Sequence, residues 1–324
     1  MGVEAPLKVL VTGGLGYLGG RVVEHLRYLQ QHELRLLVRR VPEELRSWLH
    51  GTELWQGDLT QPETLKGIGD GVDALVHLAA LNEVACARDP VVALRVNVEG
   101  TLNLLESLGT SLRSAVYVST FHVYGANGRG VVTEQTAPAP VHPYAATHLI
   151  AEEYVGMYAR TKGFNAAILR LSNGYGTPAH PLVDRWTLLV NNLCREAVEM
   201  QRLRLRSSGL QARDFVALED AVRAIGLVLT DSSKQVTIYN VGGMATYTVS
   251  EVARTVQQAY EELRGVSISL ERSEPKPGEA VESLDFRCEP LRALGYAPQG
   301  NLSKGVRETL EFCFRHFSPI VQHT

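Results

Sequence analysis

Cysteine is scarce in this sequence of 324 residues: there are four, and no two of them form a C-x-x-C pair. That scarcity argues against a disulfide framework and for buried or idle thiols in a reducing compartment. The ten histidines form no cluster at metal-ligand spacing, so no metal site is expected. No apolar run reaches the length that a membrane span needs. These absences predict a cytoplasmic protein without a membrane segment.

Positive charge is not concentrated in any block that would suit nucleic acid. The net charge is −3, and Arg202, Arg204 and Arg206 alternate with leucines. Such alternation is typical of a strand with one polar face, and it gives no reason to expect nucleic acid as a partner. With 45% hydrophobic and 21% charged residues, the chain is able to bury a large core.

What the sequence does contain is a glycine-rich turn near its start. The apolar run Val9–Val11 precedes the turn, and an amphipathic segment from about Tyr17 to Leu29 follows it. Between a strand and a helix, glycines allow a tight turn, close approach of backbone to a pyrophosphate, and tight helix packing. The helix N-terminus also presents unpaired N–H groups to phosphate. The turn therefore predicts a dinucleotide site whose contacts are Gly13, Gly16, Tyr17, Leu18 and Gly19.

Apolar strands alternate with helices through the first half of the chain. The further strands expected there are Leu34–Val38, Glu53–Gln56, Ala74–Leu78, Ala115–Ser119 and Ala166–Leu171. The helices expected between them include Glu43–Leu49, Pro90–Leu108 and Pro143–Lys162. Strands that are apolar throughout are typical of a sheet covered on both faces. The pattern predicts an α/β fold with a doubly wound parallel sheet, whose ligands bind at the carboxyl ends of the strands.

Residues at these strand ends are the candidates for cofactor contacts. Arg39 and Arg40 follow the second strand, where an acidic side chain would accept a hydrogen bond from the 2′-OH of NAD. Two cations there slightly favour the 2′-phosphate of NADP, unless they only precede a solvated helix. Asp58 is placed either to accept from the adenine amino group or to cap the next helix. The other candidates are Leu59, Leu78, Ala79, Ala80, Asn97 and Leu171.

A series of motifs along the chain resembles those of a known protein family. They are TGGLGYLGG at the start, GDL at Gly57, HLAA at His77, NVEGTLNLLE at Asn97, STFHVYG at Ser119, PYAATH at Pro143, RLSNGYG at Arg170 and ARDFVALEDAVRAI at Ala212. In this order they resemble the extended short-chain dehydrogenase/reductases, in the nucleotide-sugar epimerase/dehydratase branch.

The resemblance implies an architecture and an assembly. An NAD(P)-binding Rossmann domain would cover residues 1–176, with the strand Val236–Val241 returning to its sheet, and most of residues 177–324 would form a substrate-binding lobe. In the family, the helices that correspond to Pro90–Leu108 and Pro143–Lys162 pair across a two-fold axis. We therefore expect a homodimer, with apolar positions for that contact at Leu102, Leu105, Tyr154 and Tyr158.

The resemblance also assigns a catalytic group, with one departure. Thr120 and Tyr144 match the family's catalytic Ser/Thr and Tyr, and His148 stands where the family has lysine. A lysine cation lowers the pKa of the phenol, whereas imidazole, with an ordinary pKa of about 6.5, supplies no dependable charge at neutral pH. His148 then does a weaker version of the lysine's task, or the phenol is not the base, or redox activity is lost. A charged imidazole beside a phenolate would need either a carboxylate that raises the pKa of His148 or a site that lowers the pKa of Tyr144. Glu152 is one helical turn away and could be that carboxylate, although we expect it in solvent.

Candidate substrate contacts follow from the same comparison. The family's 4,6-dehydratases carry an Asp-Glu pair after the threonine, but this chain has Phe121 and His122, so 4,6-dehydration is disfavoured. Asn173 and Arg213 match residues that contact the nucleotide diphosphate, and a guanidinium suits that group. The alternative for Arg213 is an ion pair with a neighbouring carboxylate, Asp214 or Glu219.

Together these residues predict an NAD(P)-dependent epimerase or keto-sugar reductase that acts on a nucleoside-diphosphate sugar. The alternative function is a catalytically impaired NAD(P)-binding protein with a sensing or scaffolding role. The substrate contacts expected are Thr120, Phe121, His122, Tyr144, Asn173 and Arg213.

Overall fold

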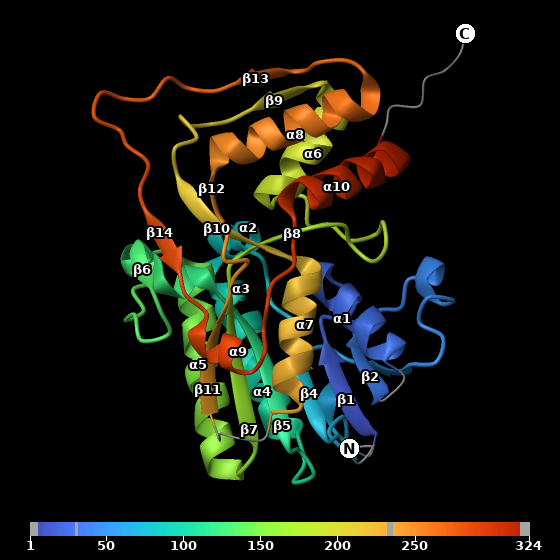
Figure 1. Cartoon of the computed structure of the whole chain (residues 1–324). Coiled ribbons are helices and arrows are strands. Elements are labelled where there is room, and N and C mark those ends of the chain that lie inside the picture. Colours follow the sequence, from blue (N-terminus) through green and yellow to red (C-terminus); the bar gives the residue numbers. More distant parts are fainter. Residues whose placement is uncertain (1–5, 30–31, 232–235, 318–324) are drawn as a thin grey trace.

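A parallel sheet of seven strands organises the computed structural model, which describes residues 6–29, 32–231 and 236–317 (Figure 1). All neighbouring strands in it are parallel. The strands lie in the order β11 (Val236–Val241), β7 (Asn165–Leu171), β5 (Ser114–Thr120), β4 (Ala74–His77), β1 (Leu7–Thr12), β2 (His32–Val38) and β3 (Glu53–Gln56). The predicted doubly wound sheet is confirmed.

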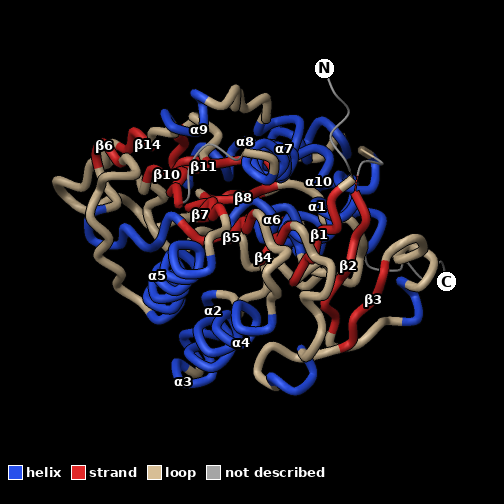
Figure 2. The backbone as a smooth tube through the Cα atoms, turned by 90° about the horizontal axis from the view of Figure 1, so that it is seen from below, coloured by secondary structure: helices blue, strands red, loops and turns tan. Residues whose placement is uncertain are grey.

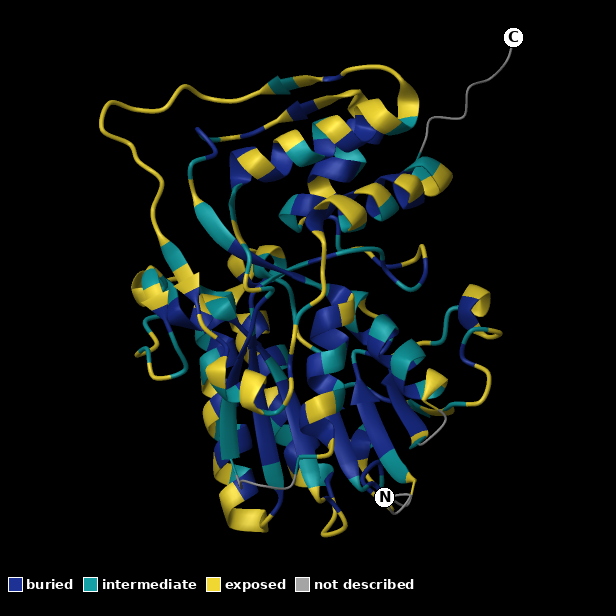
Figure 3. Cartoon of the chain, in the orientation of Figure 1, coloured by how far each residue is buried: buried dark blue, intermediate teal, exposed yellow. Residues whose placement is uncertain are grey.

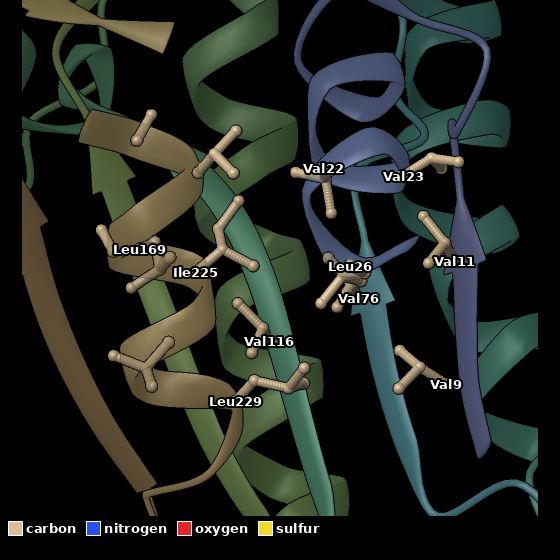
Figure 4. Close-up of a cluster of buried hydrophobic side chains, with 14 of the residues drawn as sticks. Val9, Val11, Val22, Val23, Leu26, Val76, Val116, Leu169, Ile225 and Leu229 are labelled. Carbon is tan, nitrogen blue, oxygen red and sulfur yellow. The ribbon is translucent and has the colours of Figure 1, made fainter. Parts of the chain in front are cut away.

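Both faces of this sheet are covered because successive strand residues point to opposite sides and both sets are apolar. Val9 and Val11 of β1 lie beside α1 (Tyr17–Tyr28), as Figure 4 shows, in a cluster that also contains residues of α7 (Leu218–Leu229). Leu10, between them, joins the cluster on the other face, with residues of α4 (Gly100–Ser107) and α5 (Pro143–Lys162). In Figure 2 the helices α2 to α5 lie together on that second face.

Two of the expected helices differ from the sequence pattern. Pro90–Leu108 is three consecutive segments: α3 (Pro90–Ala93), a π-helical segment (Leu94–Glu99) and α4. The helix predicted at Glu43–Leu49 is wrong, because only a 3₁₀ turn, Glu43–Leu45, forms there. Beyond that turn, Arg27 of α1 donates to the carbonyl oxygens of Trp48 and His50, which ties the segment to α1 in an irregular conformation.

The remaining elements lie mainly above the carboxyl ends of the sheet (Figure 1). Three helices there pack against one another: α6 (Leu189–Met200), α8 (Val249–Arg264) and α10 (Leu302–Phe317). Beside them are short strands in three small sheets: β8 (Asn173–Tyr175), β10 (Ala212–Ala217) and β12 (Thr246–Thr248); β9 (Arg202–Arg204) and β13 (Ser269–Glu271); β6 (Gly130–Val132) and β14 (Leu284–Phe286). The other helical pieces are α2 (Glu83–Arg88), α9 (Glu289–Ala293) and the 3₁₀ segments Pro62–Leu65 and Phe121–Asn127.

Burial follows the sequence pattern in both parts of the chain (Figure 3). In β9 the strand with one polar face is confirmed, since Leu203 is fully buried while Arg202 and Arg204 are exposed. All four thiols are free and buried, as expected, at Cys86, Cys194, Cys288 and Cys313. Among the described residues, no helix is both long and apolar enough to cross a lipid bilayer.

Candidate active site

The glycine turn after β1 is built so that its backbone lies against the end of β4. Gly13 has φ +71°, and a Cβ on it would lie 2.8 Å from the amide nitrogen of Ala79. A Cβ on Gly19 would overlap the carbonyl oxygen of Gly13. Gly16 is the N-cap of α1 and has no side chain to cap it, so the first N–H groups of the helix face the turn. The turn can therefore receive an anion such as a pyrophosphate.

A buried polar chain fixes the strand ends on either side of this turn. Thr12 Oγ1 lies 2.6 Å from His77 Nδ1, and His77 Nε2 lies 2.9 Å from Thr101 Oγ1. Burial lowers the pKa of His77 to about 4, so this ring is neutral. Asn97, a predicted cofactor contact, is only 1% exposed; its side chain accepts from Leu81 N and donates to Thr147 Oγ1. It links the end of β4 to α5.

At the adenosine end, the two predicted cations are exposed and the predicted carboxylate is engaged locally. Arg39 and Arg40 are both exposed after β2, and Arg40 lines an open groove of about 430 Å³. Asp58 Oδ1 accepts from both the N–H and the hydroxyl of Thr60, each at 2.8 Å. The alternative that Asp58 caps the next helix is wrong, because the 3₁₀ segment Pro62–Leu65 has Gln61 as its N-cap and no side-chain cap. Leu59 is buried, and a Cβ on Gly100 would lie 2.9 Å from it.

The three predicted catalytic residues lie together at the carboxyl end of β5. Thr120 ends that strand, and Tyr144 and His148 stand one turn apart on α5, with ring centroids 4.6 Å apart. Burial raises the pKa of the Tyr144 phenol, while the Arg185 guanidinium and a hydrogen bond with Thr120 act in the opposite direction. The helix places Tyr144 at its start because His142 caps it, accepting from Ala145 N at 3.2 Å.

His148 is neutral, so the hypothesis that imidazolium replaces the lysine is wrong. The ring is 3% exposed, and burial lowers its pKa to about 3, with the nearby imidazoles of His77 and His122 adding to the shift. Its Nδ1 lies 2.8 Å from the hydroxyl of Tyr117. Its Nε2 is buried and has no hydrogen-bond partner among the described residues.

Glu152 does not supply the carboxylate that a charged His148 would need. The expectation of a solvated side chain is wrong, because Glu152 is 2% exposed and its Oε2 lies 2.7 Å from Arg170 Nη2. Ser119, which precedes Thr120, donates its hydroxyl to the other carboxylate oxygen. Arg170 also lies over the ring of Tyr124, 4.9 Å from its centroid. The charge of Glu152 is thus neutralised beneath the site.

Sequence reasoning missed an ion pair that borders the catalytic group. Arg185, in the segment after β8, contacts Glu83 on α2 with 2.7 Å between Nη2 and Oε2. Thr187 donates to the second oxygen of the same carboxylate at 3.1 Å. Arg185 lowers and Glu83 raises the pKa of Tyr144. No local pattern could have revealed the pair, because its members are 102 positions apart.

On the substrate side, the Arg213 guanidinium has neither an ion pair nor a side-chain hydrogen bond within the described ranges. The alternative of an ion pair with a neighbouring carboxylate is wrong. Asp214 instead accepts from Ser172 Oγ and from Gly243 N, and Glu219 contacts Arg21.

The other predicted substrate residues differ in accessibility. Asn173 Nδ2 donates to the carbonyl of Asp214 at 3.0 Å, so it is partly engaged. His122 is exposed, with its ring centroid 6.2 Å from that of Tyr144, and it faces the site. Phe121 packs edge-on against Phe286, with centroids 5.2 Å apart, which makes it part of the wall.

Comparison with known proteins gives one family match and several similar chains. A model described as the NAD dependent epimerase/dehydratase family matches residues 9–242. The chain is 26% identical to the uncharacterized UDP-glucose epimerase YtcB of Bacillus subtilis, over 94% of this chain and 98% of that protein. It is 31% identical to a dTDP-glucose 4,6-dehydratase of Streptomyces griseus, over 76% and 74% of the two chains. The crystal structure of the Thermus thermophilus UDP-glucose 4-epimerase with NAD superposes with a TM-score of 0.79, 27% identity and coverage of 95% and 99%.

Proposed function

Because this chain belongs to the NAD dependent epimerase/dehydratase family, we propose that it is an NAD(P)-dependent enzyme that epimerises or reduces a nucleoside-diphosphate sugar. One observation carries the proposal. Thr120 and Tyr144 lie together at the carboxyl ends of the strands, the same edge of the sheet at which the glycine turn lies. Relatives and structural neighbours named as UDP-glucose epimerases support it.

The residues present fit a nicotinamide dinucleotide. At Gly13 and Gly19 the turn packs so closely against neighbouring backbone that no Cβ fits, which keeps the turn tight beside the uncapped start of α1. The buried Nε2 of His148, which has no partner in the described part of the chain, suits a hydrogen bond to the cofactor. When bound, the cofactor supplies or takes up a hydride. We propose that Tyr17, Leu18, Leu78, Ala79, Ala80 and Leu171 line its site with the glycines.

The task of the chain's own residues is to hold and move one proton. Burial raises the pKa of Tyr144, so its phenol carries the proton at neutral pH. A protonated phenol donates to a carbonyl oxygen as that carbon is reduced, and the reverse reaction needs the phenolate as base. We propose that Thr120, whose hydroxyl acts to lower the pKa of the phenol, orients it. This state favours the reduction of a keto-sugar at neutral pH over the oxidation of an alcohol.

Substrate contacts are proposed on the opposite wall of the site. The unpaired guanidinium of Arg213 is suited to a diphosphate, and Asn173 lies on the neighbouring strand of the same small sheet. The exposed imidazole of His122 would contact the sugar. Phe121 and His122 leave no pair of carboxylates after Thr120, so we do not propose 4,6-dehydration, although dehydratases are among the relatives.

For the cofactor's finer identity, we propose a modest preference for NADP over NAD. Arg39 and Arg40 are exposed at the end of β2, and Arg46 lines the groove beside Arg40. The guanidinium groups of Arg39 and Arg40 attract a 2′-phosphate more than a 2′-hydroxyl, whereas that of Arg46 is paired with Glu43 at 2.6 Å. Competitive titration tests this point, since a Kd for NAD equal to or below that for NADP would contradict the preference.

A homodimer through one helical face is part of the proposal. Six exposed apolar side chains lie on or next to α2, α3 and α5, which Figure 2 shows side by side: Val84, Val91, Val92, Leu94, Ile150 and Met157. An apolar patch of this kind is typical of a subunit contact. Leu105, expected at this contact, is instead 1% exposed and packs against the sheet. Light scattering of wild type and Met157→Glu at micromolar concentration should give a dimer and a monomer.

We further propose that the chain has two domains, as the resemblance implied. We also propose that the protein is cytoplasmic. Residues 1–176 and the strand β11 form the NAD(P)-binding domain, and most of residues 177–324 form the substrate lobe. Pairing of β11 with β7 and the separate apolar core of α6, α8 and α10 support this division.

The decisive experiment is turnover by the purified protein. Net reduction or oxidation is followed by absorbance at about 340 nm, the band of the reduced nicotinamide, and epimerisation, which leaves no net change in the cofactor, is followed by chromatography of the sugar nucleotides. UDP- and dTDP-linked sugars and their 4-keto forms are offered with each cofactor. We expect turnover that Tyr144→Phe reduces by at least about a hundredfold. We also expect Arg213→Ala to raise KM for the sugar nucleotide by about tenfold or more. Dinucleotide binding without turnover of any of these would favour the alternative, a sensing or scaffolding protein.

A further inference from the structure

Tyr117 contacts His148 directly beneath the catalytic group. It lies on β5, three residues before Thr120, and its side chain joins the core between the sheet and α5. The ring is 3% exposed, and burial raises the pKa of its hydroxyl, so the hydroxyl is protonated. The 2.8 Å contact with His148 Nδ1 is the hydrogen bond this hydroxyl makes in the described part of the chain.

Counting donors and acceptors decides which way that bond runs. A neutral imidazole has one N–H donor and one acceptor nitrogen. If Nδ1 carried the proton, the Tyr117 hydroxyl hydrogen and the His148 Nε2 lone pair would both be buried without partners. If Tyr117 donates to Nδ1, a single group, the Nε2–H, is left unpaired. Since each unpaired buried polar group costs about 1–3 kcal/mol, the second arrangement is favoured.

We propose that Tyr117 is a positioning residue that holds His148 as the Nε2–H tautomer, so that Nε2 donates to an acceptor oxygen of the bound nicotinamide nucleotide. This inference rests on the proposed function for the identity of the ligand. The pair offers the cofactor a hydrogen-bond donor that carries no charge. Tyr144, whose ring lies 4.6 Å from that of His148, consequently has no cation at this position to stabilise its phenolate.

The tautomer is tested on the whole chain without cofactor, labelled with ¹⁵N at histidine. Long-range ¹H–¹⁵N spectra at pH 7.5 should show one ring with a protonated Nε2 and an acceptor-type Nδ1, and His148→Gln should remove that signal. In Tyr117→Phe the His148 signal should move toward the average of two tautomers. A wild-type signal with protonated Nδ1, or a Tyr117→Phe spectrum unchanged at His148, overturns the proposal.

Affinity for the cofactor is the second readout, with a matched control. Tyr239→Phe also removes a buried hydroxyl, one that donates to Asp231 at 3.0 Å and belongs to the core cluster on the other face of the sheet. We expect Tyr117→Phe to weaken binding of NAD and NADP by about tenfold and Tyr239→Phe to leave it unchanged, as measured by calorimetry. Equal affinities for both variants overturn the role of Nε2–H. If wild type binds neither dinucleotide, the proposed function fails, and the spectra still decide the Tyr117–His148 bond.

Discussion

Replacing His148 with lysine should restore a cation beside the catalytic phenol. The ring centroids of the two residues are 4.6 Å apart. We take the new ammonium to lie about 5 Å from the phenol oxygen. At an effective dielectric constant of about 20, that separation gives about 3 kcal/mol of attraction for phenolate. The same energy lowers the pKa of Tyr144 by about two units. The Tyr117 hydroxyl is already in place to accept a hydrogen bond from the new ammonium.

The assay is the initial rate of alcohol oxidation as a function of pH. Because burial raises the pKa of Tyr144, the wild-type rate should keep rising with pH above neutrality, without a plateau between pH 6 and 9. In His148→Lys the rising limb should move about two units toward lower pH. Below both pKa values, at pH 7.5 for example, the rate should increase by up to about a hundredfold.

Two controls identify the cause of any change. His148→Gln keeps a hydrogen-bond donor but adds no charge, so its rate profile should stay where the wild-type profile lies. Tyr144→Phe should abolish the pH dependence in both the wild-type and the His148→Lys background. An unshifted profile in His148→Lys, or a shift that persists in Tyr144→Phe, would refute the phenol as the base.

Three further predictions concern the scaffold of the site. Gly19→Ala should abolish dinucleotide binding by calorimetry because its Cβ overlaps the turn, whereas Gly174→Ala, which meets nothing within 4 Å, should bind normally. Glu152→Ala should lower the free energy of unfolding in urea by about 3–5 kcal/mol, because it leaves a buried guanidinium unpaired; a loss below about 1 kcal/mol would contradict this. His77 and His148 have folded pKa values of about 4 and about 3, below their unfolded values, so they stabilise the fold fully above about pH 6.5. Below that pH each histidine should lower the free energy of unfolding by up to about 1.4 kcal/mol per pH unit. Unfolding curves that do not change between pH 7.5 and 5 would refute this.

The sheet could be predicted from the sequence because its signal is local. Each strand is an apolar run between turn residues, and β3 (Glu53–Gln56) has the predicted bounds. The turn at Gly13 was recognisable because only glycine fits a positive φ against neighbouring backbone. Tyr144 and His148 could be placed on one helical face from their spacing alone.

The environment of the site could not be predicted, because it depends on contacts between distant residues. Glutamates are mostly exposed, so Glu152 was expected in solvent, yet Arg170, 18 positions further on, pairs with it in the core. Tyr117 and His148 are 31 positions apart, and the sequence identifies neither as the other's partner. The neutral state of His148 follows from burial on all sides, which only the folded chain defines.

Because all four thiols are buried, their reaction with a thiol reagent can report local unfolding of the protein. Cys86 lies on α2 beside Asn97, Cys194 and Cys313 lie in the core of α6 and α10, and Cys288 packs near β6 and β14. A thiol reagent can label each of them only after the segment around it has opened. Labelling rates with and without a ligand would therefore show separately how much the cofactor site, the three-helix cluster and the outer strands fluctuate. The native sequence supplies this map without a single engineered cysteine.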